Sequence, residues 1–241
     1  MNWHWHYSKE QLLDLPSDLV EGRFKARLNR FLAMVEVDGQ EVAVHVANSG
    51  RMQELLVPGY RVLLSPRPGA HRKTGYDLAL VDLGFALVSI DSRLPNALVA
   101  EAFSKERLPQ LAEYLEIRRE VTLGDSRLDM VLEGPSGKCY LETKSVTLVV
   151  GGVGLFPDAP TLRGTKHMHS LAQARQSGHR AAVVFVVQRE DCRAFAPHDV
   201  ADPVFGVALR EGIVAGVEAF AYSCRVTEQS IEMGLPLPLR L

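Results

Sequence analysis

The most informative residues of the chain are two acids and a lysine in neighbouring β-like segments. Glu142 and Lys144 are two residues apart, and side chains at that spacing in a strand point to the same face. Asp129 lies on the polar face of the preceding segment, and turn-forming residues at 133–138 predict that the two segments pair as a hairpin. Pairing would bring Asp129 beside Glu142.

Such a group of side chains suits chemistry on a phosphodiester. Two neighbouring carboxylates repel each other unless a positive charge lies between them, and oxygen ligands suit Mg²⁺ or Mn²⁺. A lysine beside the cation could orient a metal-bound water, or take its proton, as the water attacks phosphorus. Removing one acid of a repelling pair should leave the metal-free protein equally or slightly more stable. A surface hairpin with ordinary polar faces fits the same spacing and remains the alternative.

Further candidates lie on both sides of this hairpin. Glu101, in a helical segment before it, could supply a third metal ligand, and a solvated helix face is the alternative. Arg163, Lys166 and His167 surround a predicted helix N-terminus, where backbone N–H groups and the helix dipole favour anions. Phosphate is the expected ligand there, and a capped helix start with solvated charges is the alternative.

A second group of cations lies near the N-terminus. Arg23, Lys25 and Arg27 alternate with apolar residues, so we expect all three on one strand face, with Arg30 just beyond them. A basic groove with aromatic platforms is how OB-like barrels hold single strands, but only Phe31 and Tyr60 are suitable platforms nearby. A solvated edge strand is the alternative.

Other cations complete the set of candidate nucleic-acid contacts. Arg72 and Lys73 lie in a glycine-bounded loop, and Arg127 shares the polar face of its strand with Asp129. The predicted contacts are Arg23, Lys25, Arg27, Arg30, Arg72, Lys73, Arg127, Arg163, Lys166 and His167.

The apolar patterns that must position these residues change once along the chain. Short alternating runs between 19 and 83, separated by Asp-Gly and Pro-Gly turns, predict about five strands and a closed OB-like barrel. After about residue 85, helical and strand-like runs alternate, including expected helices at 96–102, 106–117 and 166–176. The apolar run at 181–188 is typical of a strand covered on both faces.

These patterns predict an α/β protein, α+β overall, with two domains. We assign a leader to residues 1–16, an OB-like β-barrel to 17–87 and an α/β domain with a mixed central sheet to 88–241. Asp202 and the proline after it predict the N-cap and first residue of a late helix.

Composition excludes several classes of protein. With 46% hydrophobic and 23% charged residues among 241, the chain is neither disordered nor fibrous. No run approaches the roughly 20 apolar residues that span a bilayer, and the start, WHWHY, is unlike a signal peptide, so a cytoplasmic protein is expected. The net charge of −2 requires any nucleic-acid surface to be a local patch. Three widely spaced cysteines fit neither a zinc site nor a disulfide framework.

The chain is also similar to the sugar fermentation stimulation protein A family of bacteria and archaea, from about Leu19 to Leu241. The matching stretches are VEGRFKARLNRFLAMVEVDG, HVANSGRMQELLVPG, LPNALVAEA, SRLDMVLEG, LETKSVTL, GLFPDAPTLRGTKHMHSL, GHRAAVVFVVQRED and FAPHDVADPVF. The resemblance implies an OB-fold domain, a C-terminal domain similar to PD-(D/E)xK nucleases, DNA binding, and a regulatory link to maltose metabolism.

Carried onto this chain, the resemblance implies that Asp129 and Glu142 are metal ligands, that Lys144 is the catalytic lysine, and that Glu101 is the helical acid of the nuclease superfamily. One departure concerns the segment ANSGRM, where the family usually has PNTGSM. The loop at 48–52 is therefore expected to bind differently.

We predict a DNA-binding protein with a Mg²⁺-dependent, or Mn²⁺-dependent, nuclease-like site. Contacts should be mainly to the backbone, with little sequence specificity; RNA is not excluded as a ligand, a membrane is not expected as a partner, and a homodimer is compatible with the sequence. One alternative is a non-catalytic DNA-binding regulator of sugar metabolism genes such as those for maltose. Another is a hydrolase of a small phosphorylated molecule.

Overall fold

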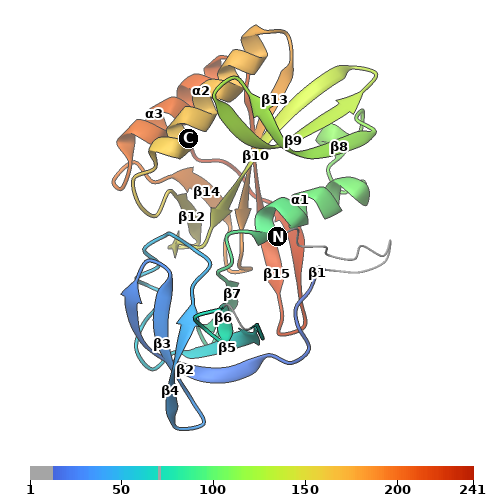
Figure 1. Cartoon of the computed structure of the whole chain (residues 1–241). Coiled ribbons are helices and arrows are strands. Elements are labelled where there is room, and N and C mark those ends of the chain that lie inside the picture. Colours follow the sequence, from blue (N-terminus) through green and yellow to red (C-terminus); the bar gives the residue numbers. More distant parts are fainter. Residues whose placement is uncertain (1–12, 70–71) are drawn as a thin grey trace.

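The computed structural model describes residues 13–69 and 72–241, so most of the expected leader at 1–16 lies outside the described residues. An N-terminal barrel occupies one end of the molecule and a larger α/β part the other (Figure 1). The predicted fold class is confirmed. No helix in the described part of the chain is long and apolar enough to cross a membrane.

The barrel is a sheet that closes on itself. Its strands are β2 (Val20–Asn29), β3 (Leu32–Val37), β4 (Gln40–His45), β5 (Arg61–Pro66), β6 (Tyr76–Asp82) and β7 (Leu87–Ser89). They follow the order β4-β3-β2-β5-β6-β7, and a parallel pairing of β4 with β6 closes the barrel. Closure leaves no long exposed edge, and inward side chains such as Phe24, Val44 and Leu64 fill the interior.

Strand β2 departs from the predicted alternation. Residues 24 and 26 lie opposite consecutive residues of β3, so Lys25 is an extra residue in a bulge. Beyond it, Arg27 lies opposite buried Ala33, whereas exposed Arg23 lies opposite Glu36. The prediction that the three cations share one face is wrong, because the bulge shifts the alternation by one residue.

The α/β part has a mixed central sheet with the strand order β1-β16-β15-β13-β10-β9-β8. Its strands are β1 (Leu13–Asp14), β8 (Glu116–Leu123), β9 (Ser126–Gly134), β10 (Gly137–Val146), β13 (Arg180–Val187), β15 (Glu218–Val226) and β16 (Ser230–Pro236). A smaller sheet contains β11 (Val149–Val150), β12 (Val153–Phe156) and β14 (Ala194–Pro197). Strands β10, β13 and β15 are parallel, and the other pairings of the central sheet are antiparallel.

Helices cover both faces of this sheet (Figure 1). They are α1 (Leu94–Ser104), α2 (Leu162–Gln176) and α3 (Pro203–Val214). Val184 of β13 packs in the cluster that contains α1, and Val183 packs in the cluster that contains α2 and α3. The prediction of a strand covered on both faces is confirmed, and each large side chain buried there contributes about 1.5–3 kcal/mol.

The expected helix at 106–117 is absent from the described structure. The chain forms a 3₁₀ turn at Pro109–Leu111 and then enters β8. Leu108, Leu111 and Tyr114 are buried at a helix-like spacing of three, which explains the error. Glu106 has a φ of 55°, outside the helical region, and Pro109 has no N–H to continue a helix.

Two helix starts agree with capping rules. Asp202 caps α3 as predicted, because its Oδ1 accepts a hydrogen bond from the Phe205 N–H at 3.0 Å. Thr161 caps α2, since its Oγ1 accepts from the Gly164 N–H at 3.0 Å. Helix α2 therefore begins four residues before the predicted start, and this brings Arg163 into its first turn.

Candidate active site

A cavity of about 410 Å³ lies between the barrel and the α/β part. Its floor is the end of β10 and the residues after it, 142–147, and its walls are the barrel loop at 48–50 and the segment 155–161 that leads into α2. Asp129, Glu142 and Lys144 all line it, so the structure brings the three predicted residues together. We call this space the active-site cavity.

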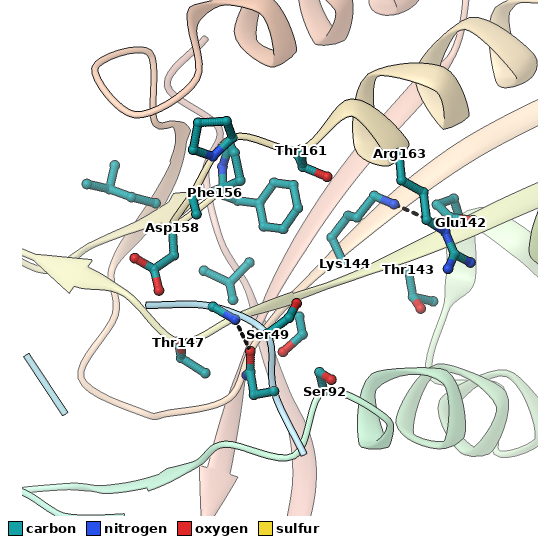
Figure 2. Close-up of a pocket in the computed structure, with 18 of the residues that line it drawn as sticks. Ser49, Ser92, Glu142, Thr143, Lys144, Thr147, Phe156, Asp158, Thr161 and Arg163 are labelled. Carbon is teal, nitrogen blue, oxygen red and sulfur yellow. Dashed lines mark hydrogen bonds and ion pairs between the residues drawn. The ribbon is translucent and has the colours of Figure 1, made fainter. Parts of the chain in front are cut away.

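Glu142 and Lys144 form an ion pair at the bottom of this cavity (Figure 2). The Nζ atom of Lys144 lies 2.5 Å from Oε1 of Glu142, and the two residues are 8% and 3% exposed. Their common orientation is the one that the alternation along β10 predicts. His167, from α2, donates from Nδ1 to the same Glu142 oxygen.

The surroundings of Glu142 keep it ionised. Burial opposes the charge on its carboxylate, but the hydrogen bond from His167 and the charge of Lys144 outweigh that effect and hold the pKa of Glu142 below its ordinary value. His167 is 3% exposed, so it lies against Glu142 and not on the surface where a phosphate contact was expected. The side chain orients the acid.

Asp129 approaches Glu142 through the backbone. Its N–H donates to Oε2 of Glu142 at 3.3 Å. Its own carboxylate accepts hydrogen bonds from the Thr143 N–H at 2.8 Å, from Thr143 Oγ1 at 2.9 Å and from Asn96 Nδ2 at 2.9 Å. Helix α1 supplies Asn96 and lies on the face of the sheet opposite to α2. It therefore holds the Asp129 carboxylate in place from that face.

Strand β9 is irregular at Asp129. Leu128 packs with α2 and α3, whereas Met130 packs with α1, although residues two apart in a regular strand share a face. The regular alternation from which we predicted a shared polar face for Arg127 and Asp129 therefore breaks at this point of the strand. The pairing of β8 with β9 skips Asp129 and Glu120, and Glu120 has a φ of 58°.

Arg163 and Arg30 bring positive charge to the cavity from opposite sides. Arg163 lies in the first turn of α2, is exposed, and reaches over the floor of the cavity (Figure 2). Its Nε lies 3.4 Å from Nε2 of His167. Arg30 lines the barrel side of the cavity. Lys166, predicted beside Arg163, instead donates to the carbonyl of Asp125 at 2.8 Å.

The other barrel cations have partners within the protein. Arg27 donates to the carbonyls of Asn48 at 2.9 Å and of Gly50 at 2.6 Å, and also to those of Arg30 and Arg51. Burial lowers the pKa of Arg27. These bonds fix the barrel loop that forms one wall of the cavity, so Arg27 is not free to bind a phosphate.

The remaining predicted contacts lie away from the cavity. Lys25 pairs with Glu36 and Arg127 with Glu120, each at 2.5 Å, and Arg72 contacts Asp77. Arg23 has a distant contact with the carbonyl of Gly59 at 3.5 Å, and Lys73 is exposed.

Glu101 does not join the two acids. It pairs with Lys105, one turn further along α1, at 2.5 Å, and it does not line the cavity. Among the described residues, no group of three or more His, Cys, Asp or Glu side chains is placed to hold a metal ion. The α1 residue that reaches the site is Asn96.

Sequence reasoning missed Asn96, Thr143 and Asp158. Thr143 lies between the two predicted residues of β10, but alternation places it on the other face. Asp158 lines the cavity, and its Oδ2 accepts from the Met52 N–H at 2.6 Å, a contact between the two parts of the molecule. Its partner lies 106 residues away, and no local pattern indicates such a contact.

Comparisons with known proteins cover both parts of the chain. Residues 26–90 match the family model described as the SfsA N-terminal OB domain, and residues 93–230 match the sugar fermentation stimulation protein RE domain. A sugar fermentation stimulation protein homolog from Desulforamulus reducens is 44% identical over 224 residues, which are 93% of each chain. A homolog from Chloroflexus aggregans is 47% identical over 221 residues, 92% of this chain and 85% of the other.

A solved structure is similar over nearly the whole chain. It is titled "The structure of Pyrococcus Furiosus SfsA in complex with Ca2+" and is 31% identical, with a TM-score of 0.88. The match covers 95% of this chain and 99% of that one.

Proposed function

The chain belongs to the sugar fermentation stimulation protein family, and from this premise we propose that it binds DNA and hydrolyses phosphodiesters at a Mg²⁺-dependent, nuclease-like site. The observation that carries the proposal is the arrangement of Asp129, Glu142 and Lys144 in one cavity, with Lys144 2.5 Å from Glu142. The similar structure, which is described as a complex with Ca²⁺, supports a divalent cation as a ligand of this site.

The donor set fits a hard cation. Asp129 and Glu142 each provide one carboxylate oxygen, Oδ1 and Oε2 respectively, that accepts a single hydrogen bond and so keeps a lone pair for a cation. Glu142 stays ionised despite its burial, as a ligand must. Two protein carboxylates are enough for Mg²⁺, which commonly keeps several waters. Glu101 is not needed, and we do not propose it as a ligand.

Three side chains of this site take the other roles in the proposed hydrolysis. A bound divalent cation would polarise a phosphodiester oxygen and lower the pKa of a water. Lys144 places its ammonium group where negative charge develops on phosphorus oxygens, and it orients the attacking water. Arg163 binds a non-bridging oxygen from the open side of the cavity, and His167 keeps the Glu142 carboxylate in one orientation.

The test is a cleavage assay with a matched lysine variant. Labelled single- and double-stranded DNA and RNA are incubated with the full chain in Mg²⁺, Mn²⁺ or EDTA. Lys144→Ala should abolish metal-dependent cleavage. Lys138→Ala, an exposed position on the same strand with the same change of charge, should cut like wild type. Thermal unfolding shows whether each variant remains folded.

A second readout does not depend on cleavage. Mg²⁺ should raise the melting temperature of wild type and of Lys138→Ala, because a ligand stabilises the state that binds it. Glu142→Gln should lose most of that increase. Equal responses of all variants to Mg²⁺, together with no cleavage by wild type, would contradict the proposal. The protein would then be better described as a non-catalytic DNA-binding regulator.

A further inference from the structure

A second hollow, of about 660 Å³, adjoins the active-site cavity on the barrel side. The two share Arg30, Ser49, Gly50, Ala159 and Pro160 as lining residues. They therefore form one groove, which runs from the ion pair of Glu142 and Lys144, past the loop at 48–50, onto the barrel. We call the second space the barrel-side hollow.

Charge is divided unevenly along this groove. The active-site cavity has three carboxylates, Asp129, Glu142 and Asp158, which oppose the cations of Arg30, Lys144 and Arg163. The barrel-side hollow has three arginines, Arg27, Arg30 and Arg51, and no carboxylate among its described lining residues. The electrostatic potential therefore becomes more positive from the active-site cavity toward the barrel-side hollow, as the binding path of a polyanion requires.

Two of these arginines are available to a ligand. Arg30 and Arg51 are exposed, and neither side chain has a hydrogen-bond or ion-pair partner among residues 13–69 and 72–241. Many arginines elsewhere are bound to acids: Arg61 contacts Glu21, Asp82 and Glu228. An arginine without a carboxylate partner, in a hollow whose described lining residues include no acid, suits a phosphate.

The wall that carries Arg51 is held from both sides. Arg27 binds the carbonyls of the loop from the barrel, and Asp158 accepts the Met52 N–H from the α/β part. Met52 has a φ of 48°, which is uncommon for a residue with a side chain, and these contacts maintain it. Arg27 is thus a positioning residue, and Arg51 projects from a fixed loop.

We propose that this groove holds a single strand of nucleic acid, with phosphates on Arg30 and Arg51 adjacent to the phosphodiester that reaches Lys144. The inference rests on the proposed function and names its substrate class. Glu142 and Lys144 are only 3% and 8% exposed, so the reacting phosphate must enter the cavity. A single strand can bend its backbone inward, whereas duplex DNA is stiff over about 150 base pairs and keeps its phosphates on the outside of a rod.

The test measures binding without metal, so that cleavage cannot interfere. Fluorescence anisotropy is recorded in EDTA for the full chain with labelled oligothymidylate, oligouridylate and a DNA duplex of equal length, over a range of KCl concentrations. The variant is Arg30→Ala with Arg51→Ala. The matched control is Arg119→Ala with Arg225→Ala, two exposed arginines outside the groove that have no side-chain partner in the described structure.

The expected result is specific to the groove and to single strands. The groove variant should bind oligothymidylate about tenfold more weakly. The slope of the logarithm of its binding constant against the logarithm of the KCl concentration should become less steep by about 0.7 for each lost phosphate contact. The control should bind like wild type. The oligouridylate arm shows whether the groove distinguishes RNA from DNA. Wild type should bind the duplex more weakly than the single strands.

Two results would overturn the inference: equal affinity of the groove variant and its control, or duplex binding by wild type as tight as single-strand binding. Either result would leave metal-dependent cleavage, and hence the proposed function, untouched. Conversely, loss of single-strand binding in the groove variant, with no cleavage by wild type, would support the groove and reject the enzyme.

Discussion

Asp77 in the barrel and Glu142 in the central sheet are both buried carboxylates surrounded by cations. Each is 3% exposed, and each has a pKa below its ordinary value because the hydrogen bonds and positive charges of basic neighbours outweigh the effect of burial. Asp77 contacts His45 at 3.2 Å, Arg67 at 3.2 Å and Arg93 at 3.3 Å, and it also contacts Arg72.

The two acids differ in what lies on their remaining side. Asp77 is enclosed by its cationic partners and does not line the active-site cavity. Glu142 faces that cavity, with a second acid, Asp129, bonded to it through its N–H. Burial and a lowered pKa therefore do not by themselves identify a functional carboxylate. Open space and a second acid separate the candidate site from an ionic cluster that holds the barrel together.

The largest expected difference between the two acids is in catalysis. Glu142→Gln should lower metal-dependent cleavage by at least about 100-fold, a cost typical of removing one group that stabilises a transition state. Asp77→Asn should cleave like wild type, because no atom of Asp77 borders the cavity. Initial rates at saturating Mg²⁺ measure both. A comparable loss in a folded Asp77→Asn would show that the barrel cluster belongs to the site.

The effects on stability should have the opposite order, with Asp77→Asn more destabilising than Glu142→Gln. Asp77→Asn should lower the free energy of unfolding by about 2–3 kcal/mol, because it removes the carboxylate charge that Arg67, Arg72 and Arg93 share. Glu142→Gln should cost about 1 kcal/mol, since water in the cavity can solvate Lys144. This differs from the expectation from the sequence that losing one acid does no harm, because the structure gives Glu142 an ion pair with Lys144 and a hydrogen bond from His167.

Urea unfolding in EDTA measures these differences. Asp199→Asn is the control, because Asp199 forms an exposed pair with Arg210 and should contribute less than about 1 kcal/mol. If Asp199→Asn lost as much unfolding free energy as Asp77→Asn, burial of Asp77 among its basic partners would add nothing to stability.

The smallest expected effect is on pH dependence. Because the pKa of Asp77 is lowered in the folded state, its contribution to stability is complete above the unfolded pKa of about 3.9 and is lost as the pH falls through the lower folded value. The difference in unfolding free energy between wild type and Asp77→Asn should therefore be constant from neutral pH to about pH 5 and narrow below about pH 4. A difference that widens in acid would require the opposite sign of shift.

Sequence patterns predicted the fold well where burial imposes a simple period. Strand β13, which is apolar after Arg180, and the capped start of α3 are of this kind, and so is the shared orientation of Glu142 and Lys144. The patterns failed where the backbone is irregular. The bulge at Lys25 and the break in pairing at Asp129 each change which face a residue occupies, and neither leaves a mark in the order of polar and apolar residues.

Prediction of the candidate site from the sequence has a similar limit. Spacing within one hairpin was enough to select Asp129, Glu142 and Lys144, because hairpin partners are close in sequence. The groups that position the acids come from elsewhere, Asn96 from α1 and His167 from α2, and one wall of their cavity is the barrel loop fixed by Arg27. Glu101 was chosen as a helical acid near the hairpin, but its place along α1 directs it to Lys105.

The hydrogen bond from Met52 to Asp158 has a consequence for modularity. The two family models divide the chain between residues 90 and 93, so each part looks like a unit that evolution or an engineer could exchange. The groove does not divide there, because its walls come from both parts and this bond ties them together. A barrel exchanged for that of another protein would bring its own loop and lose Arg30 and Arg51, so the proposed strand binding and the proposed cleavage would have to be inherited together.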